Sequence, residues 1–492
     1  MKRIYIILLV LIGISTSCTK SFEDYNTDKK RPVAVPGGFL FANAQKTFAD
    51  LEINTNVNLN EFNQWSQYWT ATTYPDETNY DIVNRNVAAT NFRWYYRDML
   101  KDLEEAKMVI KAEKPIGDAA IANQKNRLFI VDIMQVLVYH NLVNIFGNVP
   151  YSKTMDITNI YPVYDDGLTI YKDLIVRLTA DVAGLDATNT SFASDDIYMS
   201  GDVAMWKKFG NTLKVKLGIN LADVDAAASK AAVESAYAGA FADGEGCQLN
   251  YLTGGNANNF FLDFINSDRH DFVASTTIIN AMTGLSDPRM SSYFESNLPT
   301  YKGALYGITP APWNQYTHIS GDRSKDDPLY NPTGKKIAEP MFPGVILNNT
   351  ELEFYLAEAA ARGYAVGGTA EVLYNKAITA SLKQWGYTDA QVTTYLANPK
   401  VAYATATGTW QQKIATQSWI ASFGRGLNGF TTWRRLDFPI LVQGPGAPAY
   451  TDIPKRYTYP VNEQTLNPDN YKAAGTAIGG DKLTTKLFWD KF

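Results

Sequence analysis

The sequence has few of the residues that build disulfide frameworks and metal sites. Its 492 residues include two cysteines, Cys18 and Cys247, and three histidines, His140, His270 and His318. Two cysteines cannot form a framework of several disulfides, and the histidines lie too far apart for a short metal-binding motif. We therefore predict a fold held together by its hydrophobic core, with no metal centre and no cofactor.

The chain also lacks a strong excess of charge of either sign. It carries 45 Lys and Arg against 50 Asp and Glu, a net charge of -5 at pH 7. A nucleic-acid-binding surface needs a basic field, which this balance does not supply, so no nucleic-acid partner is expected. Aromatic residues, in contrast, are abundant, with 30 Tyr, 23 Phe and 10 Trp. Such rings can fill a core or offer flat faces to a ligand.

The N-terminus has the pattern of an export signal. Residues 1–17 begin with two basic residues, continue as an apolar run and close on small residues before Cys18. The run is too short to remain as a membrane span, so a signal peptide over 1–17 is predicted. The cysteine directly after it resembles a bacterial lipobox, which implies acylation of Cys18 and a lipidated tether over 18–35. An ordinary signal peptide followed by an incidental cysteine is the alternative.

Two helices are predicted between residues 350 and 386. Thr350 and Glu353 have the spacing of a capping box, which places a helix start at Thr350. After a double glycine, Ala370, Tyr374 and Ala377 have the spacing of small and aromatic residues in the second helix of a tetratricopeptide repeat. An ordinary amphipathic hairpin would show the same spacing, and a scaffold of helical hairpins follows from either.

One further segment, residues 128–147, is apolar for about the length needed to cross a bilayer. Asp132, Gln135, His140, Asn141 and Asn144 interrupt it, which favours a buried core helix. No second ligand lies at helical spacing from His140, so we predict a hydrogen-bonded core histidine there. Apolar periodicity also predicts helices over 36–51, 91–111, 165–182 and 206–221.

Two regions depart from the helical pattern. Residues 240–343 are rich in Gly, Asn, Pro and aromatics and contain one clear helix, near 275–283, while residues 440–492 form a second irregular part. The prolines of 453–474 predict an extended segment that wraps the surface. An irregular region of this length inside a helical chain favours a functional role.

Aromatic residues in two segments are candidates for ligand binding. Trp65, Tyr68 and Trp69 lie at helical spacing, and Tyr74 follows in a loop. The first three suit a core and a sugar-binding face equally well. A loop cannot bury many rings, so the rings of the loop 309–323 are stronger candidates. The predicted site combines six rings, Trp65, Tyr68, Trp69, Tyr74, Trp313 and Tyr316, with four amides for sugar hydroxyls, Asn63, Gln64, Gln67 and Asn314.

Five segments together resemble the SusD/RagB family. They are HNLVNIFGNVPYS (140–152), GDVAMWKKFGNTLKVKLG (201–218), LEFYLAEAA (352–360), WRRLDFP (433–439) and KRYTYPVNEQTLNPDNYKAA (455–474). The resemblance runs from Cys18 nearly to the C-terminus. It implies a mainly α fold over 36–492, built of tetratricopeptide-like helical pairs with an irregular, loop-rich insertion carrying short strands. It also implies a lipoprotein at the cell surface of the outer membrane that binds nutrients and caps a SusC-like TonB-dependent transporter.

The resemblance covers the scaffold and the partner but no ligand-contacting residue. We expect a non-catalytic glycan-binding lipoprotein, with a peptide-binding lipoprotein of the same transport system as the alternative. A surface glycosidase is less favoured, because it needs two carboxylates about 5 to 10 Å apart in a cleft. Asp322, Asp326 and Asp327 are the acidic cluster in the chain that could supply them, and their neighbours Pro and Gly indicate a solvated turn.

Overall fold

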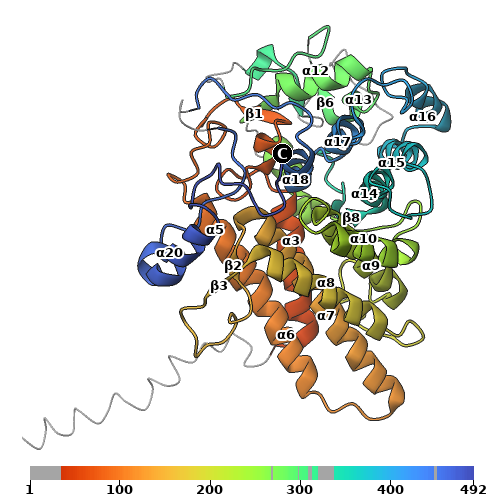
Figure 1. Cartoon of the computed structure of the whole chain (residues 1–492). Helices are drawn as coiled ribbons and strands as arrows, with labels where there is room; N and C mark the ends of the chain where they lie inside the picture. The colour runs from red at the N-terminus through yellow and green to blue at the C-terminus, as the bar shows by residue number, and fades with distance from the viewer. Residues whose placement is uncertain (1–34, 267–269, 297, 308–312, 320–336, 448–451) are drawn as a thin grey trace, which may run out of the picture.

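The protein was analysed as a computed structural model, which describes residues 35–266, 270–296, 298–307, 313–319, 337–447 and 452–492. Helices dominate these residues, and the strands are short (Figure 1). Buried apolar side chains form one large core that extends from Phe41 to Ala474. The mainly α prediction is confirmed. The predicted signal peptide over 1–17 lies outside the described residues.

Helices of the first half of the chain pack largely on their neighbours in sequence, as the apolar stripes require. Their bounds are α3 Gly37–Glu52, α4 Phe62–Trp65, α5 Val87–Arg93, α6 Lys101–Ala112, α7 Asp118–Phe146, α8 Gly167–Gly184, α9 Val203–Asn220 and α10 Ala226–Ala236. A π-helical stretch, η1 Trp94–Leu100, joins α5 to α6 and interrupts the predicted helix 91–111. As a result, Phe92 and Tyr96 of the predicted stripe are only partly buried, while Met99 and Leu103 are buried.

The apolar helix α7 is a core helix, as its polar residues predicted. By length and composition it could cross a membrane, but 83% of its most apolar window is buried inside the protein. His140 is fully buried, and its ring nitrogens lie 3.1 Å from Asn144 Nδ2 and 3.0 Å from the Tyr171 hydroxyl. Burial lowers the pKa of His140 well below its ordinary value, so the ring is neutral and structural.

The second half of the chain contains the predicted helical pair. It consists of α14 Asn349–Ala361 and α15 Ala370–Gln384, which pack on each other (Figure 1). Tyr374 and Ala377 of the predicted spacing are buried, while Ala370 at the start of α15 is partly exposed. The remaining helices of this half are α16 Asp389–Leu396, α17 Trp410–Ala421 and α18 Gly426–Leu436.

The predicted capping box at Thr350 is wrong. Helix α14 begins one residue earlier, and its N-cap is Asn348, whose side-chain oxygen accepts a hydrogen bond from Glu351 N at 3.1 Å. Thr350 therefore lies inside the helix. Glu353 turns away from the helix start and forms an ion pair with Lys376 of α15 at 3.0 Å.

The irregular region 240–343 supplies four of the eight strands in the described residues. The eight strands form four two-stranded antiparallel pairs, β1 Trp69–Ala71 with β5 Phe272–Ala274, β2 Val149–Pro150 with β3 Tyr164–Asp165, β4 Gly246–Leu249 with β8 Gly344–Asn348, and β6 Phe294–Glu295 with β7 His318–Ile319. The predicted helix near 275–283 is α12, Thr276–Leu285, and the short α11 Asn259–Phe261 and α13 Met290–Tyr293 flank it. The pairing of β1 with β5 joins the early aromatic stretch to this region.

The prediction that 453–474 wraps the surface is wrong for its first half. Tyr457 is fully buried and stacks on Phe62 with ring centroids 4.8 Å apart. The guanidinium of Arg456 is also buried, donating to Phe146 O and pairing with Asp481 at 2.6 Å. The prolines exclude a long helix but do not decide burial. The short helices α19 Glu463–Leu466 and α20 Pro468–Ala477 follow, and α20 lies on the outside of the molecule (Figure 1).

Candidate functional site

Trp65, Tyr68 and Trp69 belong to the core and not to a binding face. Their side chains are 0%, 0% and 1% exposed, so no ring face is open to a ligand. Trp65 packs edge-on against Tyr457 at 5.1 Å between centroids, and its indole N–H donates to Glu77 O at 3.1 Å. The sequence suited a core and a sugar-binding face equally well for these three rings, and the structure places all three in the core.

The neighbouring amides lie inside the protein and are not open to a ligand. Asn63, Gln64 and Gln67 are buried, in contrast to the predicted role beside sugar hydroxyls. Gln67 donates to Val442 O at 2.5 Å and accepts from Val442 N at 3.2 Å, which ties the early stretch to the C-terminal part. Gln64 Oε1 accepts from the Thr78 hydroxyl, whereas both polar atoms of the Asn63 side chain are buried without a hydrogen-bond partner among the described residues.

Tyr74 is the one ring of the early stretch that reaches the surface. Its side chain is 55% exposed, and the Arg85 guanidinium lies 5.3 Å from its ring centroid. The ring borders a cavity of about 390 Å³, which is within the size range of small-ligand sites. The lining consists of Thr55, Asn56, Val57, Asn58, Tyr74, Arg85, Asp263, Phe264, Asp271 and Phe272.

The cavity has a polar wall that is fixed by the structure. Asn56 N donates to Asn54 Oδ1 at 2.7 Å, and Asn58 N donates to Asn56 Oδ1 at 2.9 Å, so successive side chains hold the turn 54–58. On the opposite side, Arg85 pairs with the buried Glu77 and lies 3.7 Å from Asp76.

The charged residues that line the cavity are Arg85, Asp263 and Asp271, and Arg85 pairs with the buried Glu77. Burial raises its pKa above the ordinary value, and the charge of Arg85 acts in the opposite direction. The pair holds the guanidinium beside Tyr74. The site thus combines an apolar ring face with amide, hydroxyl and guanidinium groups at fixed positions.

Trp313 and Tyr316 lie close to this cavity along the strand pair. Thr72 N donates to Asp271 O, and Ala274 N donates to Thr317 O, so the early stretch, β5 and residues 313–319 are neighbours, as predicted. Both rings are partly buried against Val273 and Ala304.

The indole of Trp313 is covered on both sides. The His270 ring stacks on it with centroids 4.0 Å apart and the His318 ring with centroids 3.7 Å apart. Because aromatic carbons do not approach closer than about 3.5 Å, two rings stacked this near one centroid must lie on opposite faces. A sugar could therefore reach a face of Trp313 only by displacing a histidine, and His270 is the exposed one of the two. Asn314 beside it is exposed.

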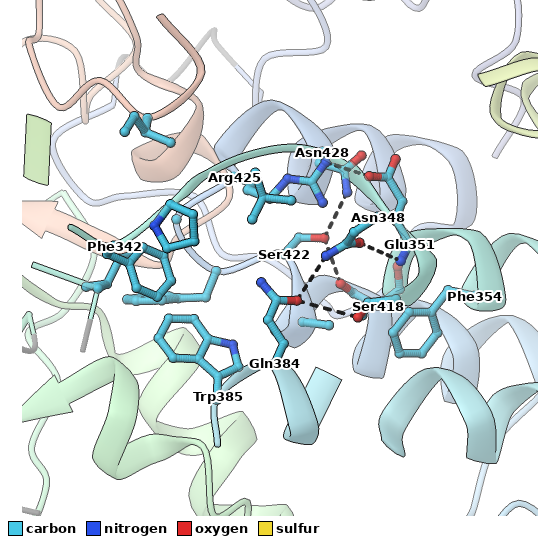
Figure 2. Close-up of a pocket in the computed structure, with 18 of the residues that line it drawn as sticks. Phe342, Asn348, Glu351, Phe354, Gln384, Trp385, Ser418, Ser422, Arg425 and Asn428 are labelled. Atoms are coloured by element: carbon cyan, nitrogen blue, oxygen red, sulfur yellow. Dashed lines mark hydrogen bonds and ion pairs between the residues drawn. The ribbon is translucent and has the colours of Figure 1, made fainter. Parts of the chain in front are cut away.

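A second cavity is too small for a nutrient. It measures about 20 Å³, room for about one water, and lies between α14, α15 and α17 (Figure 2). Figure 2 shows hydrogen bonds joining Asn348 to Gln384 and Ser422 to Asn428 around it. Glu351 is fully buried beside it and pairs with Arg425 at 2.5 Å and with Lys216 at 2.7 Å. This is a structural network that fixes the helices.

Comparison with known proteins gives the family. Residues 29–460 match the SusD-like family model, which is described as starch-binding and associating with the outer membrane. The chain belongs to the SusD-like family. A search of curated protein sequences returns no match.

Solved structures agree with this assignment. A chitin-binding protein is 24% identical over 93% of this SusD-like chain and 100% of its own, with a TM-score of 0.77. A SusD homolog from Bacteroides uniformis is 24% identical, covers 92% and 99% and has a TM-score of 0.76. A chitin-binding SusD homolog from Flavobacterium johnsoniae is 23% identical, covers 92% and 98% and has a TM-score of 0.75. At these identities the likeness establishes a shared fold.

Other predictions fall on parts of the SusD-like chain that the structure does not describe. Cys18 lies within 1–34, and Asp322, Asp326 and Asp327 lie within 320–336. Within the described ranges, no group of three or more His, Cys, Asp or Glu side chains is placed to hold a metal ion.

Of the residues that line the cavity in this SusD-like protein, Tyr74 is the one that the sequence predicted as a site residue. Arg85, Asp263 and Asp271 come from three separate segments, and no spacing relates them. The alternating asparagines at 54, 56, 58 and 60 were a usable signal, because asparagines that bond to the backbone two residues on mark an ordered polar turn.

Proposed function

We propose that this protein binds oligosaccharides at the cavity beside Tyr74 and does not cleave them. The observation that carries the proposal is the pairing of an exposed tyrosine face with the fixed polar groups of Asn56, Asn58 and Arg85 around about 390 Å³. A sugar ring presents apolar C–H faces and a rim of hydroxyls, and this wall offers a partner for each. The starch-binding description of the family and the chitin-binding titles of two structural relatives support a glycan as the ligand.

The proposal also states where the protein acts. The family model describes proteins that associate with the outer membrane. The proposal includes acylation of Cys18, a tether over 18–35, and delivery of the bound glycan to a SusC-like TonB-dependent transporter. Several acyl chains are needed for a stable anchor, because a single chain binds a bilayer only marginally.

A substitution at Tyr74 tests the binding site. Calorimetry with maltoheptaose and chitohexaose should show that Tyr74→Ala weakens binding of the preferred glycan about tenfold, within the usual range for an aromatic anchor. Tyr161→Ala is the matched control, since Tyr161 is 58% exposed and does not line the cavity. Equal affinity in the two variants would remove the site from this cavity. Release of new reducing ends from the bound glycan would contradict the non-catalytic part.

A further inference from the structure

A groove separate from the Tyr74 cavity lies between helix α15 and strand β4. Its volume is about 1020 Å³, at the upper end of the range for ligand sites. The helix and the neighbouring strand β8 lie together at one side of the molecule, beside α14 (Figure 1). None of the residues around the Tyr74 cavity lines this groove.

One wall of the groove is a single face of α15. The lining side chains recur at three- and four-residue intervals, as Val372, Asn375, Lys376, Thr379, Ala380 and Lys383. From the first to the last, this stripe is about 16 Å long at 1.5 Å per residue. An extended chain covers that length with about five residues.

The floor is the outward face of β4. Gly246, Gln248 and Asn250 line the groove, whereas the alternate residues Cys247 and Leu249 are buried in the core. Side chains on one face of a strand repeat about every 7 Å, which is also the repeat of an extended peptide lying alongside.

The groove is rich in primary amides that have bonding capacity left. Asn375 Oδ1 is buried, and it has no hydrogen-bond partner among the residues that the structure describes. Gln384 Oε1 already accepts from Asn348 at 3.0 Å and from Thr350 at 3.5 Å, and Gln248 Nε2 donates to Asn250 Oδ1 at 2.8 Å, so the groups that these bonds leave for a ligand are Gln384 Nε2 and Gln248 Oε1. Each primary amide carries both donors and an acceptor, which match the N–H and C=O groups of a peptide backbone.

The other lining residues favour a peptide over a glycan as the ligand. Tyr198 is buried, and Phe342 stacks on Trp385 at 5.1 Å, so the aromatic rings of the described lining are engaged with the protein. Val372 is 52% exposed at one end and can take an apolar side chain. Two acidic residues, Asp243 and Glu245, balance the two lysines, so the lining selects no strong charge of either sign.

From the amides, the spacing and the balanced charge, we propose that the groove between α15 and β4 binds a short peptide in an extended conformation. The amides of Asn375, Gln248 and Gln384 bond to its backbone. The apolar surface at Val372 contacts one of its side chains. Because the main recognition is of the backbone, the groove accepts peptides of varied sequence.

Panning a phage-displayed random heptapeptide library against the protein beginning at residue 19 tests this inference. Enriched peptides, labelled with fluorescein, should bind with at least tenfold lower affinity to Thr379→Arg, because the new side chain fills the groove. Thr394→Arg is the matched control. Both threonines donate to the backbone carbonyl four residues before them at 2.8 Å, and Thr394 of α16 lies away from the groove.

Gln248→Lys, on the floor of the groove, provides the second variant, should Thr379→Arg fail to fold. The inference is overturned if no peptide is enriched, or if enriched peptides bind all variants equally. It is also overturned if Thr379→Arg loses binding of maltoheptaose or chitohexaose, since the groove would then hold the glycan. Peptide binding should be unchanged in Tyr74→Ala, which keeps this result separate from the glycan proposal.

Discussion

Trp65 and Tyr74 come from one short stretch of chain, yet one is fully buried and the other is 55% exposed. Around Trp65, rings from distant segments close every side, including Phe430 at 5.6 Å and Tyr457 at 5.1 Å. Around Tyr74, the Arg85 guanidinium lies 5.3 Å from the ring centroid, and the ring borders the cavity. An aromatic residue beside amides is therefore not by itself a binding feature. What the rest of the chain places against the ring decides its role.

The sharpest test of this contrast is truncation of the buried ring. Trp65→Ala should lower the free energy of unfolding by about 3 to 5 kcal/mol, since it leaves a cavity in a packed core. Tyr74→Ala should change it by less than about 0.5 kcal/mol. Urea denaturation of both variants measures the difference, and similar losses would erase the distinction between the two rings.

The second test compares a buried carboxylate, Glu351, with an exposed one, Asp389. Glu351 is fully buried; burial alone would raise its pKa, but Lys216 and Arg425 lower it to about 2, against an ordinary value of 4.5. A carboxyl whose pKa is depressed by folding stabilises the protein above the unfolded pKa and loses that effect as the pH falls. Glu351→Gln should therefore cost about 3 kcal/mol at neutral pH.

The pH dependence provides the check on Glu351. The difference in unfolding free energy between the native protein and Glu351→Gln should shrink as the pH falls from about 4.5 toward about 2. Asp389→Asn is the control, because Asp389 pairs with Lys383 at 2.6 Å but is 93% exposed. A difference that does not depend on pH would show that the Glu351 network acts through packing alone.

The third test concerns Trp313, a ring whose burial lies between that of Trp65 and that of Tyr74. Trp313 is partly buried between His270 and His318, so Trp313→Ala should cost about 1 to 3 kcal/mol, below the loss for Trp65→Ala. Thermal unfolding and glycan titration on the same sample decide its role. Lost binding with an unchanged melting temperature supports the predicted site residue. A large fall in melting temperature assigns the ring to the core.

The helical scaffold could be predicted from the spacing of residues that are close in sequence. The periodicity of 128–147 and of 350–386 depends on residues within a few turns of each other, and both segments are helical, although α7 begins at Asp118, ten residues before the apolar segment. The six-ring site depended on long-range packing. Tyr68 donates its hydroxyl proton to Trp419 O, 351 residues along the chain, and no local spacing reports such a contact. The same limit applies to Arg85 and Asp271, which reach the cavity from separate segments.

The close fit of α18 against the early stretch also has a consequence for how the chain reaches this state. A Cβ at Gly429 would lie 2.0 Å from the Tyr68 hydroxyl, and one at Gly426 would lie 2.2 Å from Asn63 N, so these segments meet with no room to spare. Contacts between the two ends of a chain form late and slow folding, because a long loop must close first. Synthesis from the N-terminus therefore leaves Phe62, Trp65 and Tyr68 without their contacts to Trp419, Phe430 and Tyr457 until those segments have emerged. Apolar rings that stay incompletely packed over such an interval favour aggregation.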